Sequence, residues 1–109
     1  MDINPATPGH ALVIPRSHAT DRLDTTADDL AACILLAQQI ARRAKDRLGS
    51  DGVNLLNCSG EAAGQIVFHF HIHIILRFED EPGKDRIGLP WDTVPSNLDE
   101  IERIGGLLS

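Results

Sequence analysis

Cysteines are few in this sequence, and long apolar stretches are absent. The two cysteines, Cys33 and Cys58, are widely spaced and neither belongs to a C-x-x-C pair, so we expect no disulfide framework and no zinc knuckle. The sequence has no apolar run of about 18 residues, as a membrane-spanning helix needs, and no signal peptide. We therefore expect a soluble, cytoplasmic chain that does not bind membranes. Its 109 residues are the size of one domain.

Basic residues are in the minority. Lys and Arg together number 10, against 16 Asp and Glu, and the formal net charge is -6. A broad nucleic-acid interface needs a basic surface, so a nucleic acid polymer is not an expected partner. A small anionic ligand remains compatible with this charge, because backbone amides and a few histidines can bind it locally.

The most informative stretch covers residues 65–77 and reads Q-I-V-F-H-F-H-I-H-I-I-L-R. Histidines alternate with apolar residues, which predicts a β-strand over the whole stretch. Successive side chains of a strand point to opposite faces, so the three imidazoles share one face, about 6.6 Å apart along the strand. The apolar residues face a core. The two sets are His69, His71 and His73 on one face, and Phe68, Phe70, Ile72, Ile74 and Leu76 on the other.

The remaining segments predict an α+β domain, with a small antiparallel sheet, one long helix packed on a face and a short C-terminal helix. The long helix is expected over residues 27–48, with Thr26 as N-cap and Gly49 just after its C-terminal end. Two further strands are predicted over 10–15 and 53–58, a tight loop over 59–64, and a final helix from an N-cap at Ser96 to Leu108. The apolar stripe of the long helix consists of Leu30, Cys33, Ile34, Ala37, Ile40, Ala41, Ala44 and Leu48.

A row of imidazoles on one face supports three interpretations. One neutral imidazole can be a nucleophile that forms a covalent phosphoryl or nucleotidyl intermediate, if a second group fixes its tautomer and donors stabilise the developing charge. Alternatively, the row binds zinc or copper, or some of the histidines only cover the sheet. The strand offers no carboxylate or cysteine ligand, whereas Gly9, Gly60 and Gly64 offer backbone donors for an anion. The pattern therefore favours phosphate chemistry over a metal.

Specific motifs resemble those of the histidine triad (HIT) superfamily of nucleotide hydrolases and transferases. H-F-H-I-H-I-I over 69–75 is similar to the signature of that superfamily, and G-E-A-A-G-Q over 60–65 to its phosphate loop. D-I-N-P over 2–5 and P-G-H-A-L-V-I-P over 8–15 resemble its N-terminal half, as does the P-x-x-H turn that ends at His18. The resemblance covers Asp2 to about Trp91 and is strongest to the bacterial Hint-like hydrolases.

The resemblance implies a role for each matching residue. His71, the middle histidine, would be the nucleophile that attacks the α-phosphate of a nucleotide. The other catalytic positions would be His73, which holds phosphate oxygens, and His69 and His10, which orient and support the nucleophile. The binding positions would be Gly64 at the phosphate oxygens, Gln65 beside the leaving group, Asp2 and Ile3 at the ribose and base, and Ile66 and Cys58 near the phosphates.

The implied activity is hydrolysis or nucleotidyl transfer on a purine nucleotide conjugate: a phosphoramidate, an aminoacyl adenylate or a dinucleoside polyphosphate. It proceeds through a nucleotidyl-histidine and needs no metal or other cofactor. The family also implies a homodimer, with the long helix and one sheet edge at the interface and the segment around Trp91 near the partner's site. The alternatives are a nucleotide-binding module with little turnover and a metal site on the strand.

Three departures from the family pattern stand out. We expect residues 1–109 to be a single HIT domain that lacks the hairpin and short helix that, by the resemblance, usually precede the D-I-N-P motif. Ile66 stands where relatives carry Ser or Thr, so only its backbone amide is available to a phosphate. Cys58 stands where Asn is usual, and Asn57 is one place away.

Overall fold

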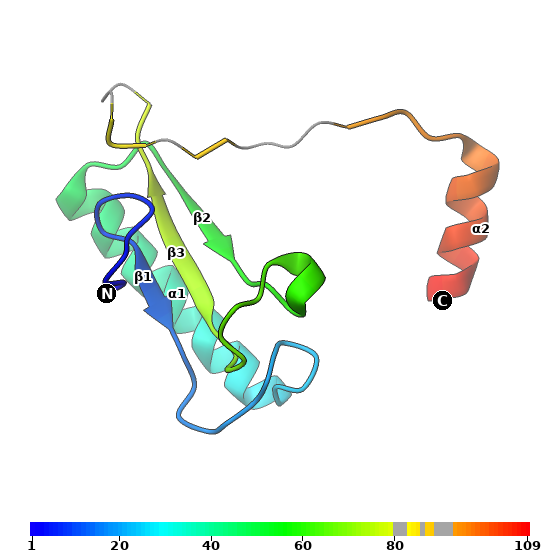
Figure 1. Cartoon of the computed structure of the whole chain (residues 1–109), viewed down its shortest axis with the longest axis horizontal. Coiled ribbons are helices and arrows are strands. Elements are labelled where there is room, and N and C mark those ends of the chain that lie inside the picture. Colours follow the sequence, from blue (N-terminus) through cyan, green and yellow to red (C-terminus); the bar gives the residue numbers. More distant parts are fainter. Residues whose placement is uncertain (80–82, 86, 89–92) are drawn as a thin grey trace.

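The fold is built on a three-stranded antiparallel sheet that a long helix covers on one face (Figure 1). The computed structural model describes residues 1–79, 83–85, 87–88 and 93–109. In chain order the elements are β1 (Ala11–Val13), α1 (Ala27–Leu48), β2 (Gly52–Leu56), the 3-10 turn η1 (Glu61–Ala63), β3 (Ile72–Arg77) and α2 (Leu98–Leu108). The strand order is β1-β3-β2, with β3 in the centre. The predicted α+β class is confirmed.

Both ends of α1 lie where the local sequence predicts them. Thr26 is the N-cap, and its side-chain oxygen accepts a hydrogen bond from the amide of Asp29 at 3.2 Å. Gly49 ends the helix in the left-handed conformation at φ 68°, and its amide donates to the carbonyl of Lys45. These short-range signals set the length of the helix independently of what it packs against.

The core lies between α1 and the face of β3 that carries its apolar residues. Ile74 and Leu76 are fully buried there, and Ala37 of α1 is fully buried against them. Part of the predicted helix stripe is not covered, however: Ile34 is 42% exposed and Leu48 is 51% exposed. The stripe therefore extends past the edge of the sheet, which is too narrow to cover it.

The predicted strand over 65–77 is wrong in its first half, since β3 begins only at Ile72. The reason is that both neighbouring strands end there. Val13 of β1 pairs with Ile72, Leu56 of β2 pairs with His73, and neither strand pairs with an earlier residue. Before that point no strand lies alongside in the described chain, and the amide of Phe70 donates to the carbonyl of Ala19 in a loop. Phe70 is still buried, but Phe68 is 47% exposed, which contradicts its predicted place in the core.

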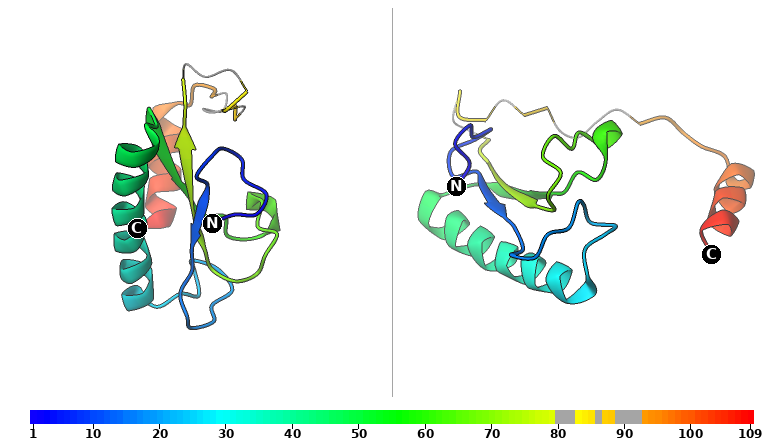
Figure 2. Two further views of the ribbon diagram at one scale, coloured as in Figure 1. Left: turned by 90° about the vertical axis from the view of Figure 1, so that its left-hand side faces the viewer. Right: turned by 60° about the horizontal axis from the view of Figure 1, so that its bottom comes forward.

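The second face of the sheet carries the segments that build the site. The N-terminal loop and the segment around η1 lie on the side of the sheet opposite α1 (Figure 2). Side chains of β3 that alternate with the core residues, including His73, point to this side. The histidine row therefore lies under two loops, with the helix behind it.

Helix α2 lies away from the sheet (Figure 1). Its N-cap is Asn97, whose side chain accepts from the amide of Glu100 at 2.9 Å, and not the predicted Ser96. The predictions made for Trp91 fall outside the described residues. Neither helix of the described chain has the length and apolar character to cross a membrane.

Candidate functional site

His71 is held by the backbone of its own segment. Its Nδ1 lies 2.7 Å from the carbonyl oxygen of His69. A carbonyl can only accept, so Nδ1 carries the proton and Nε2 keeps its lone pair. Asn57, which directly follows β2, supports this segment, because its side-chain amide donates to the carbonyl of His71 at 2.9 Å. His71 therefore presents a bare, oriented nitrogen, as a nucleophilic imidazole requires.

His73 forms a pair with His10 from the N-terminal loop. Nε2 of His10 lies 2.9 Å from Nδ1 of His73, and the ring centroids are 5.1 Å apart. His10 is 5% exposed, and its Nδ1 accepts the amide of Ala6 at 3.0 Å. The ring of His73 also meets the ring of His71 edge-on, with centroids 4.8 Å apart. Three of the four predicted catalytic histidines thus lie in one connected cluster.

His69 belongs to a second pair at the other end of the row. Its Nε2 lies 3.2 Å from the carbonyl of Pro15, and its Nδ1 lies 3.4 Å from Nδ1 of His18. His18 is exposed, and the two rings are nearly perpendicular. The side chain of His69 thus contacts His18 and Pro15, while its carbonyl orients His71.

Burial and neighbouring rings lower the pKa of His73. Burial contributes most, followed by the rings of His71 and His10, while the carboxylate of Asp2 acts in the opposite direction. The carboxylate of Asp2 lies beside His10, the ring that contacts His73, with its Oδ2 3.7 Å from Nε2 of His10. The lowered pKa keeps His73 neutral at neutral pH.

The glycine loop is closed by Gln65. The side-chain oxygen of Gln65 accepts the amide of Gly60 at 2.8 Å, and its nitrogen donates to the carbonyls of Thr20 and Val67. Gln65 is 4% exposed, so its amide group is fully used in holding the loop. Its predicted place beside a leaving group stays a prediction. The amide of Gly64 donates to Glu61, and Gly64 has φ 89°, a value that favours glycine.

The other predicted binding residues lie around this cluster with different exposure. Ile66 and Ile3 are 87% and 92% exposed, so their side chains are free to contact a ligand. Asp2 is half-buried; its amide donates to the carbonyl of His10 and its Oδ1 accepts from Asn4. Cys58 lies behind the loop, where a Cβ at Gly64 would be 3.9 Å from its sulfur. Their predicted contacts with a nucleotide stay predictions.

Two contributors to the site have little or no signal in the sequence. The sequence singles out Asn57 only as the neighbour of Cys58, at the end of a predicted strand, and predicts no role for it. The amide of Ala6 has no signal at all, because a backbone donor has no residue type of its own. Both act by orienting a histidine and not by facing a ligand.

In the part of the chain that the structure describes, one group of side chains has ligand atoms close enough to hold a metal. Ligand atoms of Asp2, His10 and His73 lie within 4.8 Å of one another. However, Nδ1 of His10 already uses its lone pair to accept the amide of Ala6. The proton of a neutral His10 ring then lies on Nε2. To bind a metal through Nε2, the ring would have to lose this proton and become an anion. The cluster is therefore better suited to moving or donating protons than to binding a cation.

Comparison with known proteins identifies this arrangement. Residues 1–80 match the model of a protein family described as the HIT domain. The chain belongs to the HIT domain family. This confirms the resemblance that the histidine motif indicated. This chain is 44% identical over 95 residues to Protein hit of Bacillus subtilis, a match that covers 85% of this chain and 62% of that protein.

Two further relatives match nearly the whole of this chain. Adenosine 5'-monophosphoramidase hnt1 of Schizosaccharomyces pombe is 34% identical over 109 residues, which are 100% of this chain and 77% of that protein. A crystal structure of a HIT family protein from Bacillus anthracis superposes with a TM-score of 0.88 at 34% identity, over 99% of this chain and 76% of that one. The chain spans less than two thirds of the length of the Bacillus subtilis relative.

Proposed function

We propose that this HIT domain hydrolyses a purine nucleotide conjugate at its α-phosphate through a nucleotidyl-histidine on His71. The observation that carries the proposal is the 2.7 Å contact between Nδ1 of His71 and the carbonyl of His69. It directs the proton to Nδ1 and leaves Nε2 as the nucleophile. No metal takes part in this scheme.

The reaction has two displacements. In the first, a bond forms between Nε2 of His71 and the α-phosphorus, while the bond from phosphorus to the leaving nitrogen or oxygen breaks. The leaving group takes up a proton from the solvent, and one proton returns to the solvent when water attacks in the second displacement. In the second, water attacks the phosphorus and breaks the N–P bond, which releases the nucleoside monophosphate and restores the imidazole. If an alcohol or amine replaces water, the same intermediate gives nucleotidyl transfer.

Donors for the phosphate oxygens are available beside His71. Among the described residues, the amide of Ile66 has no acceptor of its own and lies on the exposed side of the glycine loop. The ring of His73 lies next to that of His71. Developing negative charge on phosphorus oxygens is stabilised by such fixed donors. We therefore assign the phosphate oxygens to the Ile66 amide, the His73 ring and the loop at Gly64.

The nucleoside part would extend toward the N-terminal loop. The carboxylate of Asp2 lies next to His10 and can accept hydrogen bonds from ribose hydroxyls, and exposed Ile3 offers an apolar contact for the base. Because a relative carries the name of an adenosine monophosphoramidase, an adenosine phosphoramidate is the first substrate to test. Aminoacyl adenylates and dinucleoside polyphosphates share the α-phosphate and complete the panel.

The test compares the wild-type protein with His71→Asn in single-turnover hydrolysis of an adenosine phosphoramidate. We expect His71→Asn to bind AMP but to lose turnover by several orders of magnitude, because only positioning and electrostatics remain. His69→Asn and His10→Asn should lose less. Acid-labile radiolabel should appear on wild-type protein and not on His71→Asn. Wild-type protein that binds AMP without label or turnover on any substrate of the panel would instead indicate a nucleotide-binding module.

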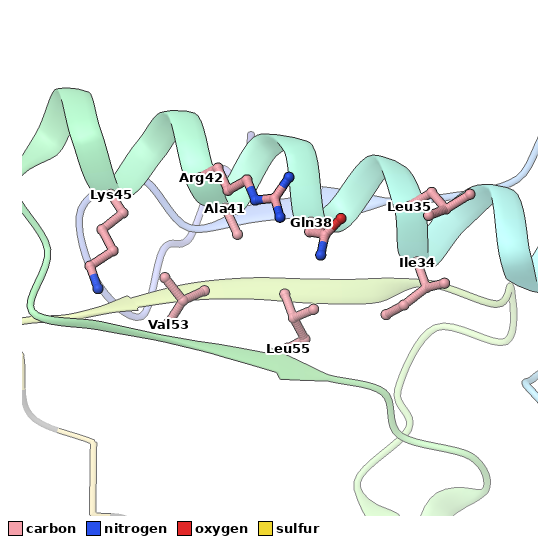
Figure 3. A pocket seen from close by; sticks show the side chains of 8 residues that line it. All are labelled: Ile34, Leu35, Gln38, Ala41, Arg42, Lys45, Val53 and Leu55. Atoms are coloured by element: carbon pink, nitrogen blue, oxygen red, sulfur yellow. The ribbon is translucent and has the colours of Figure 1, made fainter.

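We also propose that the HIT domain forms a two-fold homodimer through α1 and the edge strand β2. The outer edge of β2 is unpaired in the described sheet, and a groove of about 480 Å³ runs beside it (Figure 3). Ile34 and Ala41 of α1 point toward Val53 and Leu55 of β2 across this groove (Figure 3). Exposed edges and apolar grooves of this kind favour pairing with a second copy.

Helix α2 supports the same proposal. Its apolar residues are all at least 43% exposed, and it packs on no other described helix or strand. An apolar stripe on a short helix needs a surface to cover it. The residues of the stripe are Leu98, Ile101, Ile104 and Leu108. A second copy beside β2 would lie on the side of the sheet to which α2 extends (Figure 1).

Light scattering at micromolar concentration tests the assembly. We expect the wild-type protein to have twice the monomer mass and Leu55→Asp to shift toward the monomer, because a charge would be buried in the interface. Leu23→Asp, at a residue that is 82% exposed outside the groove, is the matched control. A monomeric wild-type protein would reject the dimer. The cytoplasmic location also stays a prediction.

A further inference from the structure

The N-terminal loop fixes where the proton lies on His10. The amide of Ala6 lies 3.0 Å from Nδ1 of His10, and an amide N–H can only donate. Nδ1 must therefore accept with its lone pair, and the ring proton of neutral His10 lies on Nε2.

The proton of His10 then fixes the tautomer of His73. Nε2 of His10 lies 2.9 Å from Nδ1 of His73, within hydrogen-bond distance, but 3.7 Å from the nearer oxygen of Asp2. Nε2–H therefore donates to His73, whose Nδ1 accepts. A neutral His73 that accepts through Nδ1 carries its own proton on Nε2.

We propose that the backbone amide of Ala6 sets the tautomer of His10 and, through it, that of His73, so that His73 offers an N–H donor to the substrate beside the bare nitrogen of His71. His10 is then a positioning residue for His73. This differs from the role that the family resemblance suggested for His10, which was to support His71 directly. The inference rests on the proposed function for its catalytic consequence, though not for the tautomers themselves.

The two neighbouring rings thus hold opposite tautomers. His71 has its proton on Nδ1, toward the carbonyl of His69, while His73 has its proton on Nε2. One ring presents a lone pair to phosphorus, and the next presents a donor to a phosphate oxygen or to the leaving atom. Burial and the rings of His71 and His10 lower the pKa of His73, which agrees with the neutral ring that this chain of hydrogen bonds requires.

The tautomers can be tested on the ligand-free protein by nitrogen NMR of histidine-labelled full chain. Bare and protonated ring nitrogens have separate chemical shifts, so each ring reports its own tautomer. We expect protons on Nε2 of His10 and His73, a proton on Nδ1 of His71, and a scalar coupling across the bond from His10 to His73. A proton on Nδ1 of either His10 or His73 would overturn the inference.

Substitutions at His10 separate a positioning role from a packing role. Gln keeps an N–H donor at the end of its side chain, whereas Leu fills similar space without one. We expect His10→Gln to retain the tautomer of His73, and His10→Leu to give a mixture of tautomers with a loss in kcat of about 10²-fold, as for the removal of one transition-state donor. Equal tautomers and equal kcat in the two variants would overturn the inference.

A second pair of variants tests the origin of the effect at the backbone. Ala6→Pro removes the N–H group, and Ala6→Ser keeps it. We expect His10 to become a mixture of tautomers only in Ala6→Pro, with changed chemical shifts at both of its ring nitrogens. Since these spectra need no substrate, a wild-type protein without turnover would reject the proposed function and leave the tautomers measurable. Unchanged ring nitrogens in Ala6→Pro would overturn the inference independently.

Discussion

Arg77 and Asp85 form an ion pair with two hydrogen bonds at the end of β3. Nε of Arg77 donates to Oδ2 at 2.7 Å and Nη2 to Oδ1 at 3.2 Å, and Nη1 reaches the side chain of Asn54 on β2. Asp85 also accepts the amides of Phe78 and Ile87. This single carboxylate therefore ties Asp85 and Ile87 to the C-terminal end of β3, at the opposite end of that strand from His73.

We predict that Asp85→Asn lowers the melting temperature at neutral pH and removes part of its pH dependence. The hydrogen bond from Arg77 and the amide of Phe78 lower the pKa of Asp85 to about 2 from 3.8. Because the folded-state pKa is depressed, the stabilisation is present above 3.8 and is lost as pH falls toward 2. The difference between the two melting curves should therefore shrink over that interval. Asp46→Asn, at an exposed position on α1, should run parallel to the wild-type curve, and an equally parallel Asp85→Asn would refute the prediction.

Gly9 is predicted to be required where the N-terminal loop enters β1. Its φ is 86°, and a Cβ there would lie 2.7 Å from Cδ1 of Leu76 and 2.8 Å from Cδ1 of Leu48. Gly9→Ala should lower the free energy of unfolding in urea by about 1–2 kcal/mol from the backbone conformation alone. Gly52→Ala is the control, since its nearest contact would be an ordinary 3.8 Å. Equal unfolding free energies in the two variants would contradict this account.

The helix α1 allows folding and assembly to be separated. Ala37 is fully buried against the sheet, whereas Ile34 is 42% exposed beside the groove. We predict that Ala37→Asp strongly lowers the melting temperature, because its charge has no partner in the core. Ile34→Asp should lower it less and reduce self-association. A larger loss of stability in Ile34→Asp, measured with the monomer concentration held constant, would reverse the assignment of the two faces.

Local signals in the sequence predicted α1 well and β3 poorly, for a physical reason. A helix satisfies its own backbone, so Thr26 and Gly49 are enough to define its ends. A strand exists only where a neighbour pairs with it, and the alternation of residues 65–71 contains no information about where β1 and β2 end. From Phe70 onward the predicted alternation is still correct: Phe70, Ile72, Ile74 and Leu76 are buried, because the core on one face fixes which side chains point inward.

The site shows the same division. The histidines could be found from sequence because their spacing is unusual, and the carbonyl of His69 is the second group that fixes the tautomer of His71. The hydrogen bond from the side chain of Gln65 to the carbonyl of Thr20 could not be predicted from sequence, since those residues are far apart in the chain and meet only through loop packing. The amide of Ala6 is likewise visible only in three dimensions.

The charge on His73 gives a prediction about pH. Its pKa is lowered by burial first and then by the rings of His71 and His10, while the carboxylate of Asp2 raises it. In the unfolded chain the imidazole takes up its proton near the ordinary value of 6.5. At pH values between 6.5 and the lower folded-state pKa, His73 is protonated in the unfolded chain but not in the folded one. The contribution of His73 to stability is therefore present above pH 6.5 and is lost as the pH falls through the folded-state pKa.

Two substitutions should move the pKa of His73 in opposite directions, and NMR titration of its ring protons measures both. Asp2→Asn removes the only one of these neighbours that raises the pKa, so the midpoint should fall further below 6.5. His71→Asn removes a ring that lowers it, so the midpoint should rise toward 6.5. The wild-type midpoint should lie between the two. An unchanged midpoint in both variants would mean that burial alone sets the charge of His73, and shifts in the same direction would contradict the opposite signs assigned to Asp2 and His71.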